Sequence, residues 1–152
     1  MGECEAASSN DKTRYEQVAI LSRGNNQCLN VLDDAYSSGS KVTTKNCDDS
    51  ETVKNLIGWD ITRNSPGKIM VPNHDNLFLG VAADQDLSIE INKHGINWLM
   101  NDKGQIIVDG SGACLTVDGN TGGTHIDECA SELIPNQGWD LIKTKNTVET
   151  VL

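Results

Sequence analysis

Residues 114–142 are CLTVDGNTGGTHIDECASELIPNQGWDLI, and this stretch decides the fold. It contains short apolar runs, one opening on a cysteine and one containing a tryptophan, with turn residues and a second cysteine between them. Short apolar or β-branched runs bounded by Gly, Asn and Asp are typical of strands joined by tight turns. The stretch therefore predicts three short β-strands, at residues 114–117, 124–126 and 137–142.

An earlier copy of this pattern runs from Cys-Leu-Asn-Val at residues 28–31 to Gly-Trp-Asp-Ile at residues 58–61. The tryptophans mark a period, because Trp59 and Trp98 are 39 residues apart and Trp98 and Trp139 are 41 apart. A period near 40 residues is also found in propeller blades, but three blades do not close a propeller. Three copies of four strands do close a small barrel, and a closed barrel leaves no exposed strand edge.

These features predict an all-β chain with a β-trefoil fold, built of three four-stranded repeats with pseudo-three-fold symmetry. The length of 152 residues suits one domain. We expect a flexible N-terminal tail at residues 1–14 and the domain at residues 15–152, with repeats at about 15–63, 64–102 and 103–146. The tryptophans are interpreted as core residues shared by the repeats, and not as platforms for a ligand.

The chain has a formal net charge of -10, which works against nucleic acid or an anionic membrane surface as a partner. No stretch approaches the roughly 20 apolar residues of a membrane span, and the polar start of the chain lacks the apolar run of a signal peptide. We therefore predict no nucleic-acid partner and no insertion into a membrane.

Four of the five cysteines fall into two close pairs, Cys28 with Cys47 and Cys114 with Cys129. Neither pair has the Cys-x2-4-Cys spacing of a zinc site, and no histidine stands close enough to complete one. Two local disulfides are favoured over free buried thiols, which indicates a secreted or extracellular protein, with the cytoplasm as the alternative. Cys4 is then left unpaired or available for an intermolecular bridge, and a homodimer is kept as an alternative to a monomer.

The first and third copies resemble the ricin-B (QxW) repeat. In that family a Cys-Leu-Asp-Val strand is disulfide-linked to a cysteine about fifteen to twenty residues on, and a Gln-x-Trp strand closes the unit. Residues 28–31 with Val-Thr-Thr-Lys-Asn-Cys at 42–47 match the first part, and residues 136–139 are a full Asn-Gln-x-Trp. The middle copy lacks the cysteines and has Ile96 in place of Gln. The resemblance covers about residues 15–145 and implies a lectin that binds glycans or glycoproteins through a β-trefoil.

The resemblance implies a site in which a carboxylate and amides bind vicinal sugar hydroxyls while an aromatic ring covers the apolar side of the sugar. This chain departs from that pattern. The aspartate of the Cys-Leu-Asp-Val strand is replaced by Asn30, Gly80 and Thr116 in the three repeats. The usual aromatic position, two residues before the second cysteine, holds Lys45 and Asp127. Galactose recognition in the manner usual for the family therefore does not follow.

The third repeat supplies the main candidate site and the first repeat a second one, while the second repeat is interpreted as scaffold. Asp118 can replace the missing acid, and His125 can stack on a sugar ring or donate a hydrogen bond. The alternatives are that residues 118–120 form an ordinary turn and that Gln137 only caps the barrel backbone. Tyr36 is the stacking candidate in the first repeat. The candidate carbohydrate-binding residues are Asp118, Asn120, His125, Asp127, Asn136, Gln137, Asn30, Asp33 and Tyr36.

No catalytic motif is present: there is no Gly-x-Ser-x-Gly, no His-Glu-x-x-His and no phosphate loop. We predict neither an enzyme nor a cofactor or metal site, and a metal triad of His74, His94 and His125 at the barrel axis is disfavoured. The rival to a lectin is a protein-binding trefoil, such as a protease inhibitor or another interaction module, because a fold does not determine a function. In that case the acidic loop at residues 48–51 would dock on a basic protein surface.

Overall fold

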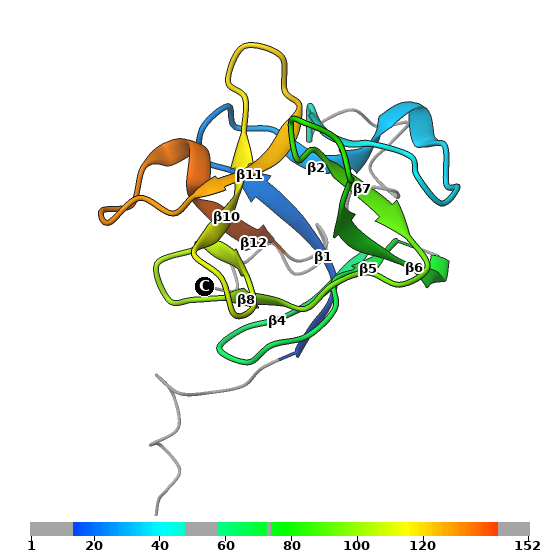
Figure 1. The fold of residues 1–152 in the computed structure, drawn as a ribbon, viewed down its shortest axis with the longest axis horizontal. Coiled ribbons are helices and arrows are strands. Elements are labelled where there is room, and N and C mark those ends of the chain that lie inside the picture. The colour runs from blue at the N-terminus through cyan, green and yellow to red at the C-terminus, as the bar shows by residue number, and fades with distance from the viewer. Residues whose placement is uncertain (1–13, 48–57, 73, 143–152) are drawn as a thin grey trace, which may run out of the picture.

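The computed structural model describes residues 14–47, 58–72 and 74–142. They contain twelve β-strands, two short 3₁₀ turns and no α-helix, which confirms the predicted all-β class (Figure 1). The strands are β1 (Arg14–Ser22), β2 (Cys28–Val31), β3 (Val42–Lys45), β4 (Trp59–Thr62), β5 (Met70–Val71), β6 (His74–Val81), β7 (Ile89–Asn92), β8 (Trp98–Met100), β9 (Ile106–Val108), β10 (Ala113–Val117), β11 (Thr124–Glu128) and β12 (Trp139–Ile142).

Six of these strands close a barrel around the core. β1 pairs antiparallel with β4 on one side and with β12 on the other. β4 pairs with β5, and β8 pairs with β9. Gly67 and Trp98 exchange two backbone hydrogen bonds of 3.0 and 2.8 Å, which join the β4–β5 side to β8. The backbone N–H of Trp139 donates to the Gly104 carbonyl at 2.9 Å and joins β12 to the turn before β9.

Three hairpins, one from each repeat, pack together at one end of the barrel: β2–β3, β6–β7 and β10–β11. Isolated antiparallel bridges link each hairpin to the other two; they pair Lys41 with Glu90, Thr43 with Gly123, and Ser88 with His125. The sequence therefore forms the predicted β-trefoil, in which each of the three repeats contributes two barrel strands and one hairpin.

The tryptophans fill the core, as predicted, and none is more than 1% exposed. Each indole N–H also donates a hydrogen bond to the carbonyl of the leucine in the first hairpin strand of its own repeat. These bonds join Trp59 to Leu29 at 3.2 Å, Trp98 to Leu79 at 3.1 Å and Trp139 to Leu115 at 3.0 Å. A buried indole N–H needs such an acceptor, and here the same acceptor position recurs in each repeat.

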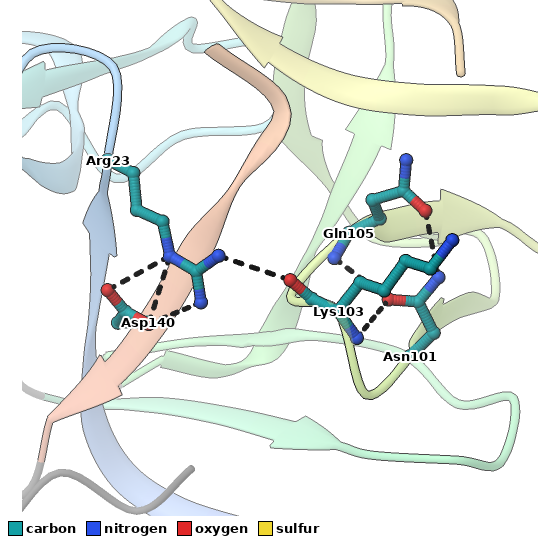
Figure 2. Close-up of polar contacts among 5 residues, drawn as sticks. All are labelled: Arg23, Asn101, Lys103, Gln105 and Asp140. Carbon is teal, nitrogen blue, oxygen red and sulfur yellow. Dashed lines mark hydrogen bonds and ion pairs between the residues drawn. The ribbon is translucent and has the colours of Figure 1, made fainter. Parts of the chain in front are cut away.

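The turn between β8 and β9 is closed by the side chain of Asn101 (Figure 2). Its Oδ1 accepts the backbone N–H groups of Lys103 and Gln105, both at 3.0 Å, and its Nδ2 donates to Gln105 Oε1 at 2.9 Å. Between them, Gly104 has a φ of +94°, and a Cβ there would lie 2.9 Å from the Trp139 carbonyl oxygen. Only glycine fits this position, because it tolerates positive φ and close approach of another backbone.

Both predicted disulfides are present, Cys28–Cys47 and Cys114–Cys129. Each ties the first strand of its hairpin to the segment that follows the second strand. Cys4 lies outside the described residues, as does the rest of segment 1–13. The first strand begins at Arg14, one residue before the predicted start of the domain. No helix in the described part of the chain is long and apolar enough to cross a membrane.

Candidate functional site

A pocket of about 450 Å³ opens between the second and third repeats, at the hairpin end of the barrel. One wall is the β10–β11 hairpin, and the other is the loop between β6 and β7, which lies beside it (Figure 1). The pocket is lined by Asp86, Ser88, Asp118, Thr121, Gly123, Thr124 and His125. Two of these, Asp118 and His125, are candidate residues predicted from the sequence.

A backbone hydrogen bond holds the β6–β7 loop against β11, and side-chain hydrogen bonds fix the loop itself and tie it to Lys41. The backbone N–H of Ile126 donates to the Leu87 carbonyl at 3.1 Å. The Asp84 carboxylate accepts the Ser88 hydroxyl at 2.5 Å and the Ser88 backbone N–H at 3.2 Å, and it forms an ion pair with Lys41 at 3.0 Å. The Ser88 hydroxyl above all, and then Lys41, hold the pKa of the Asp84 carboxyl well below its usual value. All three repeats thus fix this wall of the pocket.

Asp118 starts the turn of the third hairpin and faces the pocket. Its Oδ1 accepts the backbone N–H groups of Asn120 at 2.8 Å and Thr121 at 3.3 Å. These hydrogen bonds, the one from Asn120 first, hold the pKa of the Asp118 carboxyl below its usual value. The turn is therefore the ordinary aspartate turn that the sequence left open as an alternative. Both backbone bonds use Oδ1, and Asp118 is one of the residues that line the pocket.

His125 lies on β11 directly opposite Thr116 of β10. Its half-buried ring lines the pocket, and no hydrogen bond involves either ring nitrogen in the described part of the chain. A neutral imidazole has one donor and one acceptor nitrogen. His125 can therefore offer a ligand a donor as well as an acceptor.

The pocket is not lined by the four other predicted residues of the third repeat, which are Asn120, Asp127, Asn136 and Gln137. Asp127 is exposed further along β11, where its carboxylate accepts the backbone N–H of Glu128 at 2.8 Å. Asn120 is exposed in the hairpin turn. Asn136 lies against the turn between β1 and β2, so closely that a Cβ on Gly24 would overlap its Oδ1. The structure thus brings together only part of the predicted third-repeat site.

Gln137 is 2% exposed, and its amide is engaged by protein atoms. Its Nε2 donates to Thr116 Oγ1 at 3.2 Å and to the Glu128 carbonyl at 2.9 Å, while its Oε1 accepts the Ala130 backbone N–H at 2.9 Å. Both amide hydrogens are therefore used, which matches the alternative in which Gln137 caps the barrel backbone. It can support a sugar site by holding β10 and the end of β11 in place.

The first-repeat candidates lie in different environments. Asn30 is 2% exposed in β2. Asp33 is exposed, with a φ of +58°, in the 3₁₀ turn Leu32–Asp34. The ring of Tyr36 is half-buried against the core and stacks on His74, with centroids 4.2 Å apart and ring planes 10° apart. His74 therefore covers one face of the Tyr36 ring.

The second repeat differs from the expected pure scaffold. Its equivalent of the site acid is Gly80, where a Cβ would lie 2.7 Å from Asn92 Nδ2. Asn92 is fixed there, because its Oδ1 accepts the backbone N–H groups of His94 at 3.1 Å and Gly95 at 2.6 Å. That face of the repeat is therefore filled by protein. The β6–β7 loop nevertheless lines the pocket, which the sequence did not predict, since its contact with β11 depends on how the hairpins pack.

No group of three or more His, Cys, Asp and Glu side chains that could hold a metal ion is found in the described ranges. His74, His94 and His125 are therefore not grouped together. The acidic loop at residues 48–51, proposed as a protein-docking element, lies outside the described residues.

No protein-family model and no curated protein matches the sequence. Solved structures do match. The designed three-fold symmetric protein ThreeFoil is 15% identical with a TM-score of 0.64, covering 83% of this chain and 97% of that one. The C-terminal half of an earthworm R-type lectin, in complex with GalNAc, is 19% identical with a TM-score of 0.61, covering 84% of this chain and 98% of that one.

A third match is a non-toxic homologue of type II RIPs from bitter gourd (Momordica charantia), in complex with α-methyl-D-galactoside. It is 19% identical with a TM-score of 0.63, over 86% of this chain and 48% of that one, so this chain spans about half of its length. At such identities the likeness establishes the fold. The chain is a β-trefoil with the architecture of ricin-B-type (R-type) lectin domains.

Proposed function

We propose that the protein is a carbohydrate-binding module that recognises glycans or glycoproteins through the third repeat, and that it is not an enzyme. The observation that supports this most is the polar pocket in which Asp118 and His125 converge. A carboxylate accepts hydrogen bonds from vicinal hydroxyls, and an imidazole fixes the orientation of the sugar. Two similar structures were solved with GalNAc and α-methyl-D-galactoside, which supports a sugar as the ligand class.

The remaining predicted residues have different roles in this proposal. Asn120 and Asp127 contact parts of the glycan beyond the pocket, because both are exposed next to it. Asn136 and Gln137 hold the β10–β11 hairpin in position and do not contact the sugar. A separate first-repeat site would use Asp33 and Tyr36, with Asn30 as support.

A protein-binding trefoil is the second candidate. It is favoured by the loss of the acid that the family's sugar site uses, since Asn30, Gly80 and Thr116 occupy that position in the three repeats.

We also propose a secreted or extracellular location, because two disulfides persist only in an oxidising compartment. The binding unit in this proposal is the monomer, and light scattering after size-exclusion chromatography distinguishes it from a homodimer.

A glycan array tests the proposed function. We expect the protein to bind glycans on the array, and free sugar to compete with this binding. An Asp118→Ala variant should bind at least about tenfold more weakly, since a hydrogen bond to a charged group contributes about 1.5–3 kcal/mol. No hit at high protein concentration, together with a protein partner that competing sugars do not displace, would establish the rival.

A further inference from the structure

The pocket belongs to two repeats, which sets it apart from a site built within a single repeat. Residues 86–88 supply the wall from the second repeat, and residues 118–125 supply the wall from the third. We propose that these two segments form one composite site for an uncharged terminal sugar residue, and that acidic sugars are excluded. The inference rests on the proposed function and completes its site.

The groups that face the pocket are mostly hydrogen-bond acceptors. The Asp86 and Asp118 carboxylates can only accept. The Ser88 hydroxyl donates its hydrogen to Asp84, so its oxygen can only accept from a ligand. Thr124 donates its hydroxyl hydrogen to the Val42 carbonyl at 2.6 Å and is likewise an acceptor. These groups can accept hydrogen bonds from the hydroxyl groups of a neutral sugar. His125 supplies a hydrogen-bond donor for an oxygen atom of the sugar.

The charges around the pocket work against an anionic sugar. Neither Asp86 nor Asp118 forms an ion pair with a lysine or arginine in the described residues, and no lysine or arginine is among the residues that line the pocket. Lys41 lies beside the pocket: its Nζ donates to the hydroxyl oxygen of the lining residue Ser88 at 3.4 Å, and it is paired with Asp84 at 3.0 Å. A sialic acid carboxylate or a sulfate in this pocket would meet the carboxylates of Asp86 and Asp118, while the charge of Lys41 is already balanced by Asp84. Such like-charge contacts disfavour binding.

An apolar contact for the sugar ring is available next to the pocket. The family's aromatic position holds Asp127 in the third repeat, so stacking there is absent. Leu87 lies between two lining residues and is 45% exposed. Its backbone carbonyl accepts the Ile126 N–H, which fixes its position beside β11. The C–H face of a sugar bound between the two walls can pack on this side chain.

The experiment uses an array in which each neutral glycan stands beside its sialylated or sulfated counterpart. We expect the neutral member of each binding pair to be preferred by at least about tenfold. The strongest neutral hit is then titrated calorimetrically against variants. Asp86→Asn should lower the affinity for this glycan about tenfold, because it removes a charged acceptor that has no structural partner. The control Asp109→Asn removes an exposed charge outside the pocket and should leave the affinity unchanged.

The outcomes separate this inference from the proposed function. If the protein binds glycans and Asp118→Ala weakens binding, but Asp86→Asn and Leu87→Asn bind as the unmodified chain does, the site lies within the third repeat and the composite site is wrong. Asparagine tolerates the positive φ of residue 87, so this variant keeps the loop. Preference for an acidic glycan also overturns the inference alone. Absence of any glycan binding overturns both.

Discussion

The guanidinium of Arg23 contacts both carboxylate oxygens of Asp140, with Nη2 2.7 Å from Oδ1 and Nε 3.2 Å from each oxygen (Figure 2). Arg23 follows β1 and Asp140 belongs to β12, so the pair links the first and last strands of the barrel. Arg23 Nη1 also donates to the Lys103 carbonyl at 3.2 Å, in the turn between β8 and β9. One side chain thereby connects three distant parts of the chain.

We expect Arg23→Met to lower the free energy of unfolding by about 1 kcal/mol. The side chains of Arg23 and Asp140 are only 33% and 26% exposed, and an arginine that contacts both carboxylate oxygens stabilises more than the usual surface ion pair. Urea denaturation measures the change. Lys41→Met is the matched control: its pair with Asp84 is more open, at 44% and 39% exposure, and its removal should cost less. An equal or larger loss for Lys41→Met would contradict this ranking.

The hydrogen bond between Trp98 and the Leu79 carbonyl gives a second prediction. Trp98→Phe leaves a buried carbonyl without its donor and a smaller ring in a packed core. We expect a loss of about 2–4 kcal/mol in unfolding free energy, which combines the unsatisfied acceptor with the cavity. Thermal and urea unfolding measure it. If Trp98→Phe unfolds at the same midpoint temperature and urea concentration as the unmodified protein, the indole N–H is dispensable for stability.

The fold was predictable because its signals are local in the sequence. Each cysteine pair lies within one repeat, and each repeat carries one tryptophan near its end. A strand such as Cys28–Val31 was predicted with its observed bounds. Residues 135–137 instead form a 3₁₀ turn before β12, where the sequence predicted that the strand had already begun at Gln137. The proline at the start of that turn favours a turn conformation over strand pairing.

The site was predictable only in part because it depends on contacts between repeats. Asp118 and His125 were found from their positions in the third repeat. Asp86 and Ser88 carry no local signal, since the packing of one hairpin against another brings them to the pocket. A contact between repeats also determines the surroundings of Tyr36, because its ring stacks on His74 of the second repeat. The sequence around Tyr36 carries no signal for this contact.

The disulfides give a third prediction. A mass measurement without reductant should show two intrachain disulfides, Cys28–Cys47 and Cys114–Cys129. Replacing Cys114 and Cys129 together with serine should cost about 3 kcal/mol of stability, because a closed loop with a sequence separation of 15 restricts the unfolded chain. Free thiols at all four positions would contradict the oxidised form and remove the support for an extracellular location.

The Asp84 carboxyl gives a prediction on pH. Its folded pKa lies below the unfolded value near 3.9, so its contribution to stability is present above about pH 4 and is lost as the pH falls toward the folded pKa. Asp84→Asn should therefore be less stable than the unmodified protein at pH 7, and the difference should shrink below about pH 4. Denaturation curves at pH 7, 4 and 3 measure it, with Asp109→Asn as the control that keeps the original pH profile.

Gln137 gives the last prediction, because its amide connects Thr116 on β10 with Glu128 and Ala130 at the end of β11. We expect Gln137→Ala to weaken glycan binding indirectly, by loosening the hairpin that carries Asp118 and His125. The readout that identifies a positioning role is hydrogen exchange in the free protein: the Ala130 amide, which donates to Gln137, should lose protection. Asn120→Ala, which removes an exposed side chain of the same hairpin, should leave that protection intact. Weaker binding with unchanged Ala130 protection would instead mean that Gln137 contacts the sugar itself.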